Sequence, residues 1–142
     1  IPLPLIIGFT KAIEIAISNQ IHNSNYLSKH RNNLLTGLLK CNEDILINGS
    51  LKNRLPHNLN VTFPHVNGAR LHKQLKPKLV CSSGSVCSNG SPSHVLLSLG
   101  RSVKEAESSI RLSIGLSTTS AEIDKAIQII NSSVHLLNKE SF

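Results

Sequence analysis

The chain has 142 residues, of which 39% are hydrophobic and 16% are charged, which indicates one ordinary globular domain and excludes a disordered chain. The formal net charge of +7 would suit nucleic acid, but the basic residues are spread along the chain and only 3% of residues are aromatic. Few rings are therefore available to stack on bases, and we expect no nucleic-acid partner.

Three cysteines, in a chain with no signal-peptide pattern, indicate free thiols in a reducing cytoplasm. Their spacing lacks a zinc signature, so no metal site is expected. The apolar opening IPLPLIIGF is too short to span a bilayer, and we expect it to be buried rather than embedded in a membrane.

The first part of the chain predicts a long helix followed by two strands. Apolar residues at helical spacing run over residues 8–39, although the polar stretch 22–25 could interrupt the helix. A brief strand is expected at 45–47, and the alternation of apolar and polar residues predicts a half-buried strand at 58–63.

The second part predicts short elements and a closing helix. A helix at 69–75 and a strand at 79–81 precede a loop of small residues, and strict alternation predicts another strand at 109–114. Two capping boxes, Ser102 with Glu105 and Thr119 with Glu122, predict the starts of two further helices. The fold class is therefore α+β, with a short mixed sheet and helices on one face.

Cys87 lies in a segment, residues 81–92, that is rich in serine and contains two glycines. Little side-chain bulk anchors such a loop, so we expect an exposed and mobile thiol, which is one requirement for a reactive cysteine. The spacing alone leaves Cys87 either catalytic or incidental. Cys81 ends an apolar strand and Cys41 follows a helix, so both are expected to pack in the interior.

Arg111 stands in the middle of the 109–114 strand, between apolar neighbours. An unpaired guanidinium is costly to bury, so this residue needs an anion or solvent. Three alternatives remain open: a salt bridge to one of the eight acidic residues, an edge strand with Arg111 in water, or a bidentate clamp on a substrate carboxylate.

The order of several motifs resembles the cysteine desulfurases of the NifS/IscS type, which are class V aminotransferase-like enzymes of fold type I. The resemblance covers nearly the whole chain, and the cysteine loop is its most specific part. The matching motifs are Ser82-Ser-Gly-Ser-Val-Cys87, Pro92-Ser-His-Val-Leu96, Leu99-Gly100, Ser109-Ile-Arg111-Leu-Ser-Ile-Gly115 and Thr118-Thr119, preceded by Asn48-Gly49 and Arg54-Leu-Pro56.

The resemblance implies a C-terminal part only. Residues 1–40 would form a long interdomain helix region and residues 41–142 the C-terminal small domain with its catalytic cysteine loop. The domain that binds pyridoxal phosphate would precede residue 1. We therefore expect no cofactor-binding residue in this chain, and no activity of the chain alone.

The resemblance also implies the chemistry and the partners. L-cysteine would be the substrate, Arg111 would bind its carboxylate, and the thiolate of Cys87 would take its sulfur as a persulfide while alanine leaves. The persulfide would pass to a sulfur acceptor such as an iron–sulfur scaffold protein, and the full-length enzyme would be a homodimer.

Two departures from the family pattern accompany the match. The stretch between Cys87 and Pro92 is shorter than in many members, and Leu116-Ser117 stands where an Arg-Phe pair is common. The alternatives are a related class V aminotransferase or selenocysteine lyase, which needs no loop thiol, and a catalytically silent module that docks on scaffold proteins.

Overall fold

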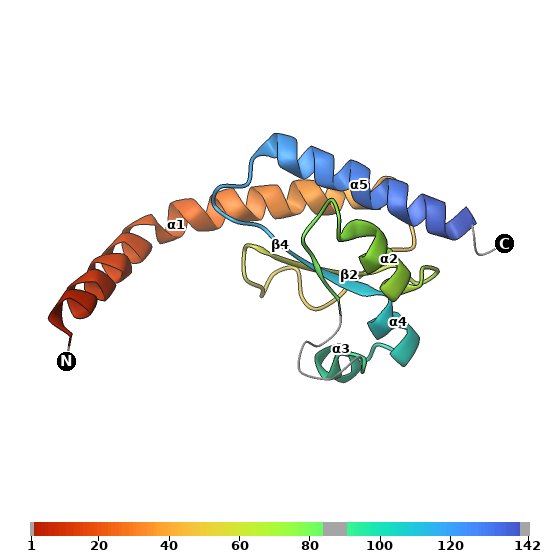
Figure 1. Cartoon of the computed structure of the whole chain (residues 1–142), viewed down its shortest axis with the longest axis horizontal. Coiled ribbons are helices and arrows are strands. Elements are labelled where there is room, and N and C mark those ends of the chain that lie inside the picture. The colour runs from red at the N-terminus through yellow and green to blue at the C-terminus, as the bar shows by residue number, and fades with distance from the viewer. Residues whose placement is uncertain (1, 84–90, 140–142) are drawn as a thin grey trace.

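The computed structural model describes residues 2–83 and 91–139. Its longest element is helix α1 (Leu3–Leu39), which continues through the polar stretch 22–25 without a break. The second half of α1 packs beside helix α5 (Ser120–Lys139), whereas its first half projects away from the rest of the molecule (Figure 1).

Four short strands form one sheet within the described residues. Strands β1 (Leu46–Ile47), β2 (Asn58–Thr62), β3 (Ser82–Ser83) and β4 (Ser109–Ser113) lie in the order β1-β2-β4-β3. Every pairing is antiparallel, so the expectation of a mixed sheet was wrong in this detail. Alternation of apolar and polar residues predicts which face a side chain takes, but it carries no information on strand direction.

The strand expected at 79–81 lies slightly later in the chain. The backbone N–H of Leu79 donates to the carbonyl oxygen of Leu75 at 2.8 Å, so this residue lies in the turn that follows helix α2 (Gly68–Leu75) and bonds back to its last residue. Pairing with β4 begins at Ser82, which lies opposite Arg111. The apolar run 79–81 therefore approaches the sheet without being part of a strand.

One face of the sheet carries the hydrophobic core. Leu59 and Val61 from β2 and Ile110 and Leu112 from β4 are buried there, against helices α1, α2 and α5. The short helices α3 (His94–Ser98) and α4 (Val103–Glu107) lie on the other side of the molecule from α1 and α5 (Figure 1). The α+β class, the packing of the large helices on one face and the long N-terminal helix are confirmed.

Both predicted capping boxes are present. The hydroxyl of Ser102 accepts from the backbone N–H of Glu105, whose carboxylate accepts from the backbone N–H of Ser102 at 2.7 Å. Thr119 and Glu122 repeat the arrangement at the start of α5, with a return bond of 2.8 Å. Each box satisfies backbone donors that the first turn of a helix leaves unpaired.

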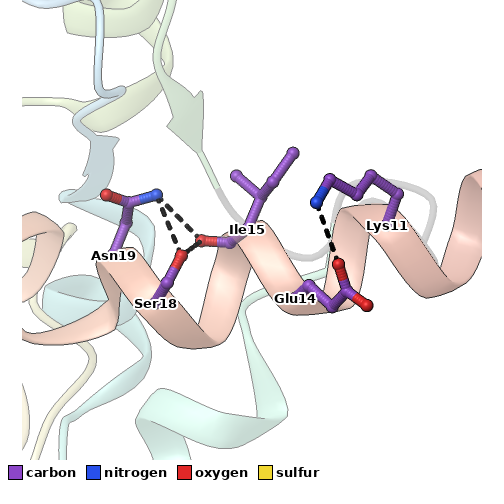
Figure 2. Close-up of polar contacts among 5 residues, drawn as sticks. All are labelled: Lys11, Glu14, Ile15, Ser18 and Asn19. Atoms are coloured by element: carbon purple, nitrogen blue, oxygen red, sulfur yellow. Dashed lines mark hydrogen bonds and ion pairs between the residues drawn. The ribbon is translucent and has the colours of Figure 1, made fainter.

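The first half of α1 is apolar and exposed. Leu5 is 71% exposed and Phe9 68%, so the expectation of a buried opening segment was wrong for the chain as it stands. The polar residues of this half bond within the helix, as Figure 2 shows for Lys11 with Glu14 and for Ser18 and Asn19 with the carbonyl oxygen of Ile15. None of the described helices is long and apolar enough to cross a bilayer.

Candidate substrate-binding site

The face of the sheet opposite the core carries a cavity of about 280 Å³. This volume lies near the lower end of ligand pockets, which usually measure roughly 300–1,000 Å³, so the cavity suits a small molecule. Strand residues form its polar floor and helix α3 forms its apolar side. The lining residues are Asn48, Asn58, Asn60, Ser82, Ser93, Val95, Leu96, Leu99, Ser109 and Arg111.

Arg111 is the cationic residue of this cavity. It lies on β4, which runs between β2 and β3, and it faces Asn60 on one side and Ser82 on the other. Its side chain is exposed, and within the described part of the chain it makes no hydrogen bond or ion pair. The described residues thus offer neither the salt bridge nor the edge strand that the sequence left open, and the guanidinium is available to an external anion.

A buried asparagine organises the floor beside Arg111. Asn48 is 3% exposed, and its side-chain nitrogen donates to Asn60 Oδ1 at 2.8 Å and to Thr62 Oγ1 at 2.9 Å. Its side-chain oxygen accepts from Arg101 Nε at 2.6 Å. The sequence pattern assigns no site role to Asn48, Asn60 or Arg101, because their contacts depend on strand register.

Cys87 falls in the range 84–90, which lies outside the described residues. The nearest described residues on each side of that range include Ser82 and Ser93, and both line the cavity that holds Arg111. The described chain on both sides of this range therefore contributes to the cavity that Arg111 lines.

The other two thiols differ in their surroundings. Cys81 is half-buried against the core, as expected, and burial raises the pKa of its thiol, which makes the reactive thiolate scarcer. Cys41 is exposed in the turn after α1, so the expectation that it packs in the interior was wrong. The helix ends before this residue, and the apolar stripe that buries Leu38 does not reach it.

The cavity can bind an anion but does not fit a Schiff-base cofactor. A carboxylate suits a free guanidinium flanked by an amide and a hydroxyl, because all three groups can donate hydrogen bonds to it. Pyridoxal phosphate needs a lysine for its covalent link, and the described residues that line the cavity include no lysine, carboxylate or aromatic ring. Fold and cavity together define a small α+β domain with a polar cavity that contains an arginine.

The comparisons with known proteins give the family. The chain matches Aminotransferase class-V over residues 1–126, and it therefore belongs to that family. It is 44% identical over 143 residues to the protein named cysteine desulfurase IscS of Vibrio cholerae, covering 99% of this chain and 35% of that protein. The protein of the same name from Methylococcus capsulatus is 41% identical over 138 residues, covering 96% and 34%.

Solved structures agree with the sequence relatives. A NifS-like protein superposes with a TM-score of 0.80 at 27% identity, covering 96% of this chain and 35% of its own. A NifS-like protein from Rickettsia africae gives a TM-score of 0.75 at 28% identity, covering 90% and 33%. The chain thus spans about a third of the length of the curated relatives it matches.

Proposed function

We propose that this chain is the C-terminal part of a cysteine desulfurase that uses pyridoxal phosphate and acts on L-cysteine. The observation that carries the proposal is the cavity itself. It holds a guanidinium without a described protein partner, and the chain on either side of the segment that carries Cys87 lines it. The names of the relatives support the same activity.

In this proposal Arg111 binds the α-carboxylate of the substrate. Arginine presents several donors in a planar fork that matches the two oxygens of a carboxylate, and Arg111 needs to break no described contact to do so. Holding the carboxylate fixes the direction in which the thiol group of the substrate extends. Arg111 therefore orients the substrate for attack by a nucleophile that arrives from outside the sheet.

Cys87 is the proposed nucleophile. Its thiolate attacks the substrate sulfur, the new S–S bond forms as the substrate C–S bond breaks, and the carbon keeps the electron pair and takes up a proton. The products are alanine and a persulfide on Cys87, so the atoms balance and no external oxidant is required. A loop of small residues suits a thiol that must meet the substrate and then an acceptor.

The cofactor belongs outside the cavity described here. When bound, pyridoxal phosphate would act as the electron sink for the carbon that loses sulfur. The cavity supplies none of its usual partners, so we assign cofactor binding to a part of the protein outside this chain. The persulfide would then pass to a sulfur acceptor, such as an iron–sulfur scaffold protein, from a homodimeric enzyme.

The test uses a full-length protein that carries this chain. Cys87→Ser should abolish persulfide formation on the protein after addition of L-cysteine, detected by mass spectrometry, while the cofactor absorbance stays. Cys41→Ser is the matched control, since it removes an exposed thiol away from the cavity and should leave the persulfide unchanged. Persulfide and alanine formation that survive in Cys87→Ser would refute the assignment.

The same protein distinguishes the related class V activities. In the Cys41→Ser background, alkylation of Cys87 should stop sulfur transfer, because the proposed nucleophile is blocked. An aminotransferase or a selenocysteine lyase that needs no loop thiol would keep its activity after alkylation. That result would replace the desulfurase proposal with one of these activities.

A further inference from the structure

Four polar side chains form a row across the floor of the cavity. Arg111 on β4 lies directly opposite Asn60 on β2 and Ser82 on β3, and the backbone N–H of Asn48 donates to the carbonyl oxygen of Asn60 at 3.0 Å. Side chains directly opposite on antiparallel strands have Cβ atoms about 4.5–5.5 Å apart. The carboxamide of Asn60 is therefore a direct neighbour of the Arg111 side chain.

The orientation of the first amide in this row is fixed by an arginine. Arg101 Nε, which can only donate, lies 2.6 Å from Asn48 Oδ1, and Arg101 Nη2 donates to the carbonyl oxygen of Ile47 at 2.9 Å. An arginine cannot accept a hydrogen bond, so the oxygen of the Asn48 amide must face it. The nitrogen of Asn48 must then face Asn60 and Thr62.

The second amide follows from the first. Asn48 Nδ2 donates to the side chain of Asn60 at 2.8 Å, so the atom of Asn60 that it meets must be the oxygen. The amide nitrogen of Asn60, with two N–H donors, is left for the cavity on the side of Arg111. No hydrogen bond of this nitrogen occurs within the described residues.

Two groups of donors thus lie side by side, and neither the Arg111 guanidinium nor the Asn60 amide nitrogen makes a hydrogen bond to an acceptor among the described residues. The guanidinium of Arg111 only donates, and the free end of Asn60 also only donates. An amide that turned its oxygen to the guanidinium would satisfy both groups internally, but Arg101 and Asn48 hold it the other way. Such an arrangement favours a ligand that only accepts, and a carboxylate with two oxygens is that ligand.

We infer that Asn60 is a second ligand of the substrate carboxylate beside Arg111, and that Arg101 is a positioning residue that orients it through Asn48. The inference rests on the proposed function in one respect, which is that the ligand is an amino acid. It adds a specificity element: the site distinguishes a free carboxylate from an amide, because an amide brings a donor that meets the Asn60 nitrogen.

The test compares two probes in the full-length holoprotein. L-Alanine has the free carboxylate of the product, and L-alaninamide lacks it, so calorimetric titration with both isolates the carboxylate contact. Asn60→Asp keeps the oxygen that Asn48 contacts but replaces the free donor by a negative oxygen. It should weaken L-alanine binding at least about tenfold but should not weaken L-alaninamide binding, because the amide of that probe can donate to the new oxygen.

Two variants of Arg101 test the positioning role. Arg101→Ala removes the donor that orients Asn48 and should weaken L-alanine binding several-fold, again without weakening L-alaninamide binding. Arg101→Lys keeps a donor next to Asn48 and should recover most of the affinity. If Arg101 had only a structural role, Arg101→Ala would weaken the binding of L-alanine and of L-alaninamide alike. An equal loss of affinity for the two probes therefore overturns the inference.

The outcomes separate this inference from the proposed function. If Asn60→Asp binds L-alanine as the parent protein does while Arg111→Ala does not, Asn60 is not a ligand and the desulfurase proposal stands. If neither variant affects L-alanine binding, the carboxylate site itself is wrong and both proposals fail in that part. Persulfide formation on Cys87 remains an independent readout of sulfur transfer.

Discussion

Removing the guanidinium of Arg111 should weaken substrate binding without weakening the fold. Because the side chain is exposed and has no described partner, Arg111→Ala leaves no buried group unsatisfied. Surface substitutions of this kind change the free energy of unfolding by about 0.5 kcal/mol or less. The melting temperature of the variant should therefore match that of the parent protein.

The expected loss of affinity for the substrate is much larger than this change in stability. A hydrogen bond to a charged group contributes about 1.5–3 kcal/mol, which corresponds to roughly a 10- to 150-fold change in affinity. The carboxylate takes no part in bond breaking, so the contact has similar strength before and during the reaction. The loss should therefore appear mainly as a higher KM for L-cysteine, with a smaller change in kcat.

The assay is alanine formation by the full-length protein over a range of L-cysteine concentrations. The KM of Arg111→Lys for L-cysteine should lie between those of the parent protein and Arg111→Ala, since lysine keeps the charge but not the planar fork. Lys125→Ala is the control, because it removes an exposed cation from helix α5, which packs on the opposite face of the sheet. A change of less than about threefold in Arg111→Ala, under ~0.7 kcal/mol, would refute the carboxylate assignment.

Three further outcomes concern stability and association. A Cβ atom on Gly68 would lie 1.8 Å from the carbonyl oxygen of Glu107, so Gly68→Ala should destabilise the fold by about 3 kcal/mol or more in denaturant unfolding. A Cβ atom on Gly8, in the interior of α1, would have no atom within 4 Å, so Gly8→Ala should leave the stability unchanged or raise it. Equal denaturation midpoints for Gly68→Ala and Gly8→Ala would contradict the packing argument. Hydrogen bonds from the backbone and hydroxyl of Ser102 lower the pKa of Glu105, and those from Thr119 lower the pKa of Glu122. Since both pKa values fall on folding, this stability is present above the ordinary value of 4.5 and is lost as the pH falls through the folded values, so Glu105→Gln should reduce the acid sensitivity of the unfolding free energy. The exposed apolar half of α1 should make the isolated chain self-associate in sedimentation experiments, Ile7→Lys with Ile17→Lys should reduce this, and a monomeric parent chain would refute the expectation.

Local sequence signals predicted the elements that depend on neighbours along the chain. The two capping boxes, the alternating strand that carries Arg111 and the apolar stripe of the second half of α1 are all confirmed. The family also followed from the order of motifs, and the class-V match confirms it. Each of these signals needs only residues a few positions apart, or their order in the sequence.

Features that depend on register could not be predicted in the same way. Asn48 precedes a glycine, which indicates a turn, yet its side chain is buried by contacts to β2 and Arg101. Asn60 was recognised only as a polar position of an alternating strand. Its position beside Arg111 follows from pairing across 51 residues of sequence, which no local pattern encodes. The opening segment, residues 1–9, was misjudged because apolar composition predicts burial but does not identify the surface that would cover it.

The hydrophobic face of the sheet is also what holds the candidate site together. Leu59, Val61 and Ile110 are completely buried, and side chains alternate between the two faces with a period of two. A slip of β4 against β2 by one residue would turn Ile110 to the cavity and drive Arg111 into the apolar core, where an unpaired charge is very costly. The core therefore enforces the register that places Arg111 between Asn60 and Ser82. The geometry of the candidate site is thus a consequence of packing on the other face of the sheet, although no described residue of the core cluster lines the floor of the cavity.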